Sequence, residues 1–225
     1  MGWQSITYDA ARDKMQPGDI IAFSSNQGLS RVIKWATRSD VTHVGIVFQT
    51  KVFLYGEAQE GILNQVMEAT VVSGASGGGA VISNRLSTRL KFYPGVLWWL
   101  PLRDDLRQRT DLRALYNFLL RQEHYPYDIQ QAVFSALDLP VTFHLFSRLL
   151  TTAEDSSKMF CSELAAGALK AGGTIKNINP SEVTPIDLCR FELYQSDYYQ
   201  LKGPRMEIEG FNSRSPEGWG LGSYG

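Results

Sequence analysis

Residues 42–61, THVGIVFQTKVFLYGEAQEG, contain two runs of β-branched and aromatic residues on either side of Gln49-Thr50-Lys51. This pattern predicts an antiparallel hairpin. If the loop has three residues centred on Thr50, His43 faces Glu57 directly on the same face of the sheet. A two-residue loop would place these two side chains on opposite faces.

Other segments alternate between strand and helix signals, which predicts an α+β fold. The run IIAFS after Pro-Gly-Asp and the run VLWWL are typical of buried strands. Predicted strands lie within 17–25, 80–83 and 96–103. Predicted helices lie within 30–38, 106–122, 125–139, 160–171 and 185–189.

The chain has 225 residues, a length that suits one large domain or two small ones. We expect a single domain over residues 1–202. Residues 203–225 are rich in glycine and polar residues with single aromatics, which favours an extended C-terminal tail outside the domain. Nothing in the sequence identifies a partner for this tail.

The charge pattern argues against several classes of partner. The formal net charge is −1, so we expect no nucleic-acid partner. The N-terminus lacks a basic start followed by an apolar run, and no apolar stretch approaches the roughly 18 residues that span a bilayer. These patterns predict a cytoplasmic protein without a transmembrane segment.

The two cysteines and three histidines show no metal-ligand spacing, so we expect neither a metal nor another cofactor. Cys161 lies at the start of the helix predicted from MFCSELAAGALKAGG. Unpaired N–H groups and the dipole at a helix start stabilise an anion, which favours a reactive thiolate. The alternative is a small buried residue of the core, which is our interpretation of Cys189.

His43 lies within an apolar strand run, where a histidine can be purely structural or a general base. A carboxylate such as Glu57 facing it would set the tautomer and stabilise the imidazolium, as a nucleophile–base–acid site requires. A solvated strand-end glutamate is the alternative for Glu57. Tyr127, in the sequence YPYD, either lines a cleft or forms a turn.

Six short motifs occur in a fixed order along residues 15–190: PGDIIAFS, THVGIV, YGEA, YD, FCSEL and VTPIDL. Together they resemble the circularly permuted papain-fold hydrolases related to NlpC-type cell-wall peptidases, the YaeF/YiiX-type amidases. In that group the histidine precedes the acidic residue and the cysteine comes last, as here. The segment FCSEL differs from the Asn-Cys-Glu-His-Phe-like segment of the related lecithin:retinol acyltransferase-like proteins.

The resemblance implies a circularly permuted papain-like fold with a small antiparallel sheet packed against helices. It also implies a cysteine peptidase or amidase in which Cys161 is the nucleophile, His43 the base and then the acid, and Glu57 the orienting residue. Tyr127 is a candidate for the oxyanion or cleft position. The implied substrate is an amide or ester, such as a peptide, a peptidoglycan fragment or a lipid amide.

Two other functions stay open from the sequence. A thiol acyltransferase acting on lipids or amines would use the same acyl-enzyme intermediate as a hydrolase. A non-catalytic binding or structural module could also use this fold, with the tail docking a partner.

Overall fold

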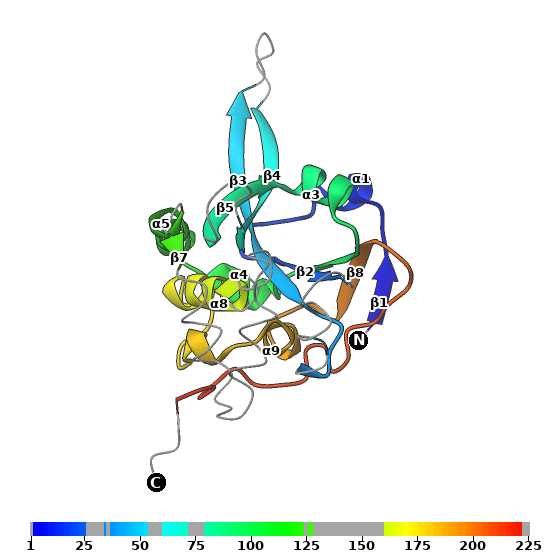
Figure 1. Cartoon of the computed structure of the whole chain (residues 1–225). Helices are drawn as coiled ribbons and strands as arrows, with labels where there is room; N and C mark the ends of the chain where they lie inside the picture. Colours follow the sequence, from blue (N-terminus) through cyan, green and yellow to red (C-terminus); the bar gives the residue numbers. More distant parts are fainter. Residues whose placement is uncertain are drawn as a thin grey trace.

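The computed structural model describes residues 2–25, 34, 37–53, 60–71, 79–123, 126–127 and 160–221. Within these ranges the strands form one mixed sheet of eight, in the order β1-β8-β6-β2-β3-β4-β5-β7 (Figure 1). The strands are β1 (Gly2–Ser5), β2 (Ile20–Ser24), β3 (His43–Phe53), β4 (Glu60–Val71), β5 (Gly79–Arg85), β6 (Val96–Leu100), β7 (Pro126–Tyr127) and β8 (Asp197–Lys202). The helices are α1 (Tyr8–Ala11), α3 (Leu86–Phe92), α4 (Asp104–Arg109), α5 (Leu112–Gln122), α8 (Phe160–Ala171), α9 (Pro185–Arg190) and the short 3₁₀ helix η2 (Pro180–Glu182).

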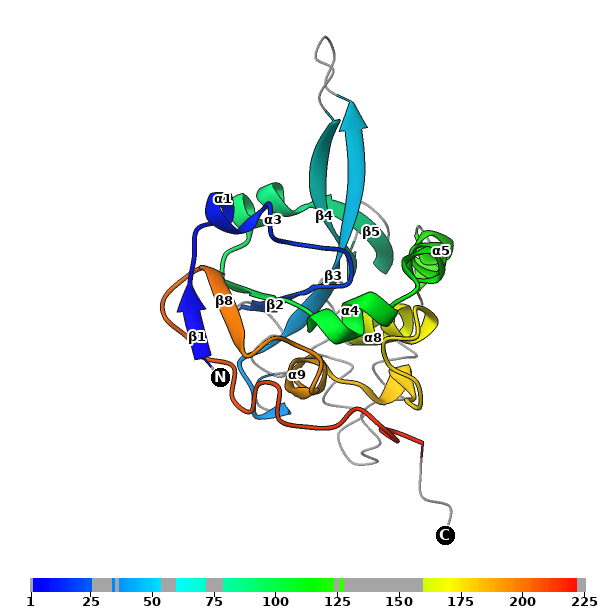
Figure 2. The same ribbon diagram turned by 180° about the vertical axis from the view of Figure 1, so that it is seen from behind.

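The α+β class is confirmed, but the expected small antiparallel sheet is wrong in two respects. The sheet is larger than expected, and it is mixed because β1 pairs in parallel with β8 at one end. Figure 2 shows these two strands side by side near the N-terminus. The sequence showed no signal for β1, since its four residues are too few for an alternating pattern to be recognised.

The central strands are covered on both faces. In β2, Ile20 and Ala22 point into one core cluster, which also contains apolar residues of α5, α8 and α9. Ile21 and Phe23 point into a second cluster with residues of α1 and α3. Alternation of side chains along a strand explains why a continuous apolar run such as IIAF serves both faces.

Most local predictions are confirmed in the described ranges, with one helix divided. The predicted helix 106–122 ends at Arg109 and starts again at Leu112. The break occurs because Thr110 is extended and the Asp111 carboxylate accepts the N–H of Ala114, capping α5. The predicted helix 125–139 is wrong at residues 126–127, which form β7, and otherwise lies outside the described residues.

The predicted hairpin register is also wrong. Strand β3 continues through Thr50 and Lys51 to Phe53, and it pairs with β4 so that Gln49 faces Asn64 and Thr50 faces Leu63. The polar residues 49–51 are therefore strand residues, and the Thr50 hydroxyl bonds the side chain of Gln65 across the pair. The long β3–β4 ribbon extends beyond the rest of the molecule in Figure 1.

The C-terminal segment is described to Leu221 and packs onto the core. Ile208 and Phe211 are buried, and the Phe211 ring lies 4.4 Å from the ring of Tyr198 between centroids. The Asn212 side chain accepts the N–H of Tyr194 and donates to its carbonyl, at 3.1 and 3.0 Å. Residues 203–221 thus run along the core and contribute to it instead of forming a free arm.

Candidate active site

His43 is the first residue of β3, and the residue is only 4% exposed. It pairs with Phe23 of β2 on one side, and the two rings lie 5.1 Å apart between centroids. On the other side the ladder to β4 begins only at Ile46, opposite Met67. The start of β3 therefore has backbone groups on its β4 side that the described ladder does not use.

One of these groups faces the candidate nucleophile. The Val47 N–H donates to the Asp19 carbonyl on the β2 side. Since backbone N–H groups alternate in direction along a strand, the Val44 N–H points the other way. It donates to Sγ of Cys161 at 3.4 Å. A backbone N–H directed at a sulfur atom stabilises negative charge on that atom.

Cys161 is the second residue of α8 and is buried. The helix packs on the sheet through Leu164, Ala165, Ala168 and Leu169, which recur at helical spacing and join the core that contains β3. Gly172 and Gly173 end it, as predicted, and Gly173 has a positive φ of 73°. The apolar stripe thus fixes the helix, and with it the first turn, beside the start of β3.

The acidic partner of His43 is Glu68 of β4. Nε2 of His43 lies 2.8 Å from Oε2 of Glu68, and both side chains are buried. Continuing the β3–β4 register places Glu68 opposite Gly45, on the face that carries His43. A Cβ atom at Gly45 would lie 3.4 Å from Cβ of Glu68 and 2.3 Å from Cγ2 of Val66, so glycine is required for this close approach.

Glu68 has two further partners that complete its hydrogen bonding. Nδ2 of Asn84, on β5, donates to Oε1 at 2.8 Å. Arg89, on α3, contacts both oxygens: Nε lies 2.7 Å from Oε1, and Nη2 donates to Oε2 at 2.8 Å. A buried carboxylate with this many donors can remain ionised.

The electrostatics of the pair follow from these contacts. Burial by itself disfavours protonated His43, but its interactions with Cys161 and then with Glu68 outweigh that effect and raise the pKa of His43 from 6.5 to about 9. Burial likewise opposes ionisation of Glu68, but His43, Arg89 and Asn84 lower the pKa of Glu68 below its ordinary value. At neutral pH, His43 is therefore protonated and lies between the sulfur atom of Cys161 and the carboxylate of Glu68.

The structure brings together only some of the predicted site residues. Cys161 and His43 lie close enough for the cysteine to favour the protonated imidazole, and their catalytic roles stay a prediction. Glu57 lies outside the described residues, and the register that would have placed it opposite His43 is not the one observed. Tyr127 belongs to β7, which pairs with β5 and is separated from β3 by two strands.

Cys189 is structural, as the sequence suggests, and the structure gives Asp19 a structural role as well. Cys189 is buried in the core, and burial raises the pKa of its thiol well above the ordinary value. Asp19 is also buried, and its carboxylate accepts from the Trp99 indole, the Leu102 N–H and Arg107. This carboxylate joins the start of β2 to β6 and α4.

The functional residue missed from the sequence is Glu68. It occurs in the run VMEATV, where a single carboxylate interrupts apolar residues of a strand. A lone acid in such a run indicates a buried carboxylate with dedicated partners, since an unpaired charge there would be too costly. That signal identifies Glu68 as a special residue, although it does not identify His43 as its partner.

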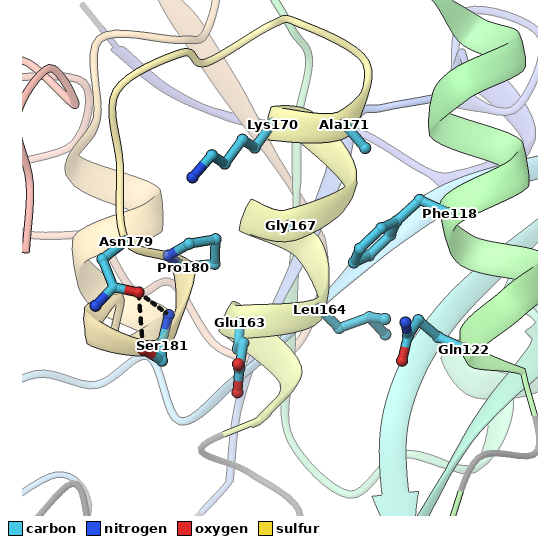
Figure 3. A pocket seen from close by; sticks show the side chains of 10 residues that line it. All are labelled: Phe118, Gln122, Glu163, Leu164, Gly167, Lys170, Ala171, Asn179, Pro180 and Ser181. Atoms are coloured by element: carbon cyan, nitrogen blue, oxygen red, sulfur yellow. Dashed lines mark hydrogen bonds between the residues drawn. The ribbon is translucent and has the colours of Figure 1, made fainter.

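A separate pocket of about 610 Å³ lies beside α8 (Figure 3). Its walls come from α5, α8 and the segment around η2, with Phe118 and Leu164 on one side and Asn179 and Pro180 on the other. Glu163 also lines it, and burial raises the pKa of that carboxyl. Neither Cys161 nor His43 is among the described residues that line this pocket.

The described part of the chain contains no cluster of three or more histidine, cysteine, aspartate or glutamate side chains that could hold a metal ion. No helix within the same ranges is long and apolar enough to cross a membrane. Comparison of the chain with models of protein families and with curated proteins found no match.

Proposed function

We propose that this protein is a thiol hydrolase that cleaves an amide bond, in a peptide or an N-acyl compound, through an acyl-enzyme intermediate. The observation that carries the proposal is the chain of contacts from Cys161 through His43 to Glu68. Its order along the sequence, histidine then acid then cysteine, is the order of the permuted papain-like hydrolases that the sequence resembles. We therefore propose a permuted papain-like fold as well.

The arrangement supplies each component that thiol catalysis requires. The imidazolium of His43 stabilises a thiolate on Cys161, and Glu68 orients the ring through Nε2. This leaves Nδ1, which is buried and has no hydrogen-bond partner in the described ranges, as the nitrogen that exchanges a proton with sulfur and substrate. The N–H of Val44 and the first turn of α8 add further stabilisation of negative charge.

In the proposed reaction, Sγ of Cys161 attacks the carbonyl carbon and forms a C–S bond. The imidazolium of His43 then protonates the leaving nitrogen as the C–N bond breaks, which leaves a thioester and a neutral imidazole. A water molecule gives its proton to His43 and attacks the thioester. The C–S bond then breaks, which releases the carboxylic acid and leaves Cys161 as a thiolate beside the imidazolium of His43.

The reactivity of Cys161 is the first measurement. We expect iodoacetamide to modify Cys161 and not Cys189 in the native protein, as read by peptide mass spectrometry. Glu68→Gln keeps the shape of the side chain but removes its charge, so it should slow the modification of Cys161 at least tenfold. Glu57→Gln is the matched control and should have no effect, because Glu68 already occupies Nε2 of His43.

Turnover then distinguishes the three candidate functions. A panel of fluorogenic N-acyl amides and aryl esters should acylate Cys161, and His43→Ala should reduce the rate by about 10²–10⁴. If an added amine captures most of the acyl group, the protein is an acyltransferase. If Cys161 is inert to iodoacetamide and to all substrates at pH 6–9, the proposal is wrong and the protein is better interpreted as a non-catalytic binding module.

A further inference from the structure

We propose that Arg89 is a positioning residue of this site: by binding both oxygens of Glu68, it holds the carboxylate ionised and directed at His43. This inference rests on the proposed function, since it concerns a residue that orients the acidic group of the same site. Arg89 touches neither the thiol nor the imidazole in any described contact, so its effect must pass through Glu68.

The geometry of the contact supports a positioning role. A carboxylate can rotate about its last bond, but Oε2 of Glu68 must stay in line with Nε2 of His43 to orient the ring. The planar guanidinium of Arg89 contacts Oε1 through Nε and Oε2 through Nη2, at 2.7 and 2.8 Å. Nη2 donates a hydrogen bond to Oε2, whereas Nε makes an ion-pair contact with Oε1 and has no hydrogen-bond partner among the described residues. This two-point fork restricts rotation of the carboxylate more than a single point charge can.

Arg89 is itself held in place by aromatic rings. Its guanidinium carbon lies 5.4 Å from the ring centroids of both Phe23 and Tyr93. Phe23 in turn packs against His43, with ring centroids 5.1 Å apart. The same aromatic ring therefore contacts both the imidazole and the guanidinium, and both of these groups reach Oε2 of Glu68.

The short helix α3 that carries Arg89 is anchored at both ends. Leu86, its first residue, is fully buried. At the other end, Nζ of Lys202 donates to the carbonyls of Leu90 and Tyr93 at 2.6 and 2.7 Å. Because a lysine that caps a helix end satisfies carbonyls that would otherwise lack partners, it fixes the position of the last turn, and hence of Arg89.

The charged and titratable groups around Glu68 allow a prediction with two independent parts. Within the described ranges they are His43 from β3, Arg89 from α3 and Tyr93 just after α3, with Cys161 beyond His43. Loss of Arg89 removes a cation that favours ionised Glu68, so the pKa of Glu68 should rise. While Glu68 remains ionised, loss of a competing cation does not weaken its attraction for the imidazolium, so the pKa of His43 should not fall.

The test compares Arg89→Gln with Arg89→Lys and with Arg85→Gln as the matched control. Arg85 is exposed and lies just before α3, so its substitution removes the same charge without touching Glu68. The pKa of Glu68 is read from its carboxyl ¹³C shift and that of His43 from its ring ¹⁵N shifts. The rate at which iodoacetamide modifies Cys161 is measured from pH 3 to 10, and circular dichroism shows that each variant is folded.

In Arg89→Gln we expect the Glu68 pKa and the acidic midpoint of Cys161 modification to rise together by about one to two pH units. The pKa of His43, about 9 in the wild type and read from the ring ¹⁵N shifts, should not fall. Arg89→Lys should recover part of the acidic midpoint, since it restores the charge without the fork. Arg85→Gln should match the wild type.

Several results would overturn the inference. If Arg89→Gln and Arg85→Gln behave alike, or if the pKa of His43 falls while that of Glu68 rises in Arg89→Gln, Arg89 has no specific hold on Glu68. If Arg89→Gln does not fold, a wild-type profile in Arg89→Lys refutes the need for the fork. An inert Cys161 in the wild-type protein refutes the proposed function itself, whereas a reactive wild type with an unchanged Arg89→Gln refutes only the role of Arg89.

Discussion

The stability of this protein should fall as the pH rises through the range in which His43 loses its proton. Its pKa is 6.5 in an unfolded chain and about 9 in the folded protein. Below pH 6.5 both states bind the proton, so the folded state has the full benefit of its stronger binding. Between these two values only the folded state keeps the proton, and the benefit is lost as the pH rises to about 9.

The size of the effect follows from the interval between the two pKa values. Each pH unit of that interval is worth roughly 1.4 kcal/mol, so His43 contributes about 3 kcal/mol at pH 6 and close to nothing above pH 9. His43 is only 4% exposed, so solvent screens the interaction little. This contribution is a substantial part of the roughly 5–15 kcal/mol that is typical of a folded domain.

The assay is urea denaturation followed by circular dichroism in the presence of a reductant, at pH values from 6 to 9.5. His43→Gln provides the comparison, because it keeps a side chain that can donate to Glu68 but does not titrate. The wild type should lose about 3 kcal/mol relative to this variant across the range. Cys161→Ser should show a smaller loss, since Cys161 is the strongest of the interactions that favour protonated His43.

A difference in the free energy of unfolding between wild type and His43→Gln that stays constant with pH would refute the reasoning, because it would mean that the folded protein does not raise the pKa of His43.

The contribution of Glu68 to stability should depend on pH in the opposite direction, at acidic pH. Its pKa is lowered on folding, so its contribution is present above about pH 4.5 and is lost as the pH falls through the folded value.

Two further predictions concern packing. Gly45→Ala should lower the free energy of unfolding by about 1–3 kcal/mol and slow the modification of Cys161, because the new Cβ would lie 2.3 Å from Val66 Cγ2 and push β4 away from His43. A variant that is as stable as the wild type in urea denaturation would contradict this prediction. Phe211→Ala should cost about 3–5 kcal/mol, since Phe211 is 8% exposed, while Phe92→Ala, at a position 70% exposed, should cost little. Equal effects of these two substitutions on the thermal midpoint would mean that the C-terminal segment does not belong to the core.

The site lies where a regular ladder stops, and this explains how a strand can supply both a base and a donor to the nucleophile. In the middle of the sheet, the N–H groups of β3 are used by β2 and β4. At its start the described β4 ladder has ended, so the N–H of Val44 is available to Cys161. A histidine placed two residues further along would lie among paired strands, and its neighbouring N–H groups would be occupied.

Local sequence patterns were sufficient to predict the elements that carry Cys161 and His43, the proposed nucleophile and base. The apolar stripe and the glycines after Cys161 predict α8, and the β-rich run around His43 predicts the start of β3. Both signals depend on residues within about ten positions of one another, which is the range over which helical and strand periodicity can be read. The resemblance to permuted hydrolases rests on the same local motifs.

The acidic partner of His43 could not be predicted from local sequence patterns. Strand β3 continues past Thr50 to Phe53, and the resulting register decides which carboxylate lies near His43. Thr50 and Lys51 are polar, so the sequence pattern resembles a turn, yet β-branched threonine pairs well within a strand. The polar residues continue the ladder because β4 offers partners over that length.

The sequence by itself determined the class of the fold, the helix that begins at Cys161 and the strand that begins at His43, because each depends on short-range periodicity. Only the tertiary structure decided that Glu68 is the partner of His43, that Arg89 and Asn84 hold Glu68, and that the C-terminal segment belongs to the core. These contacts join residues 16 to 25 positions apart or more, through pairing of strands and docking of α3. Register and docking depend on the free energy of the whole sheet and its two cores, and no local pattern contains that information.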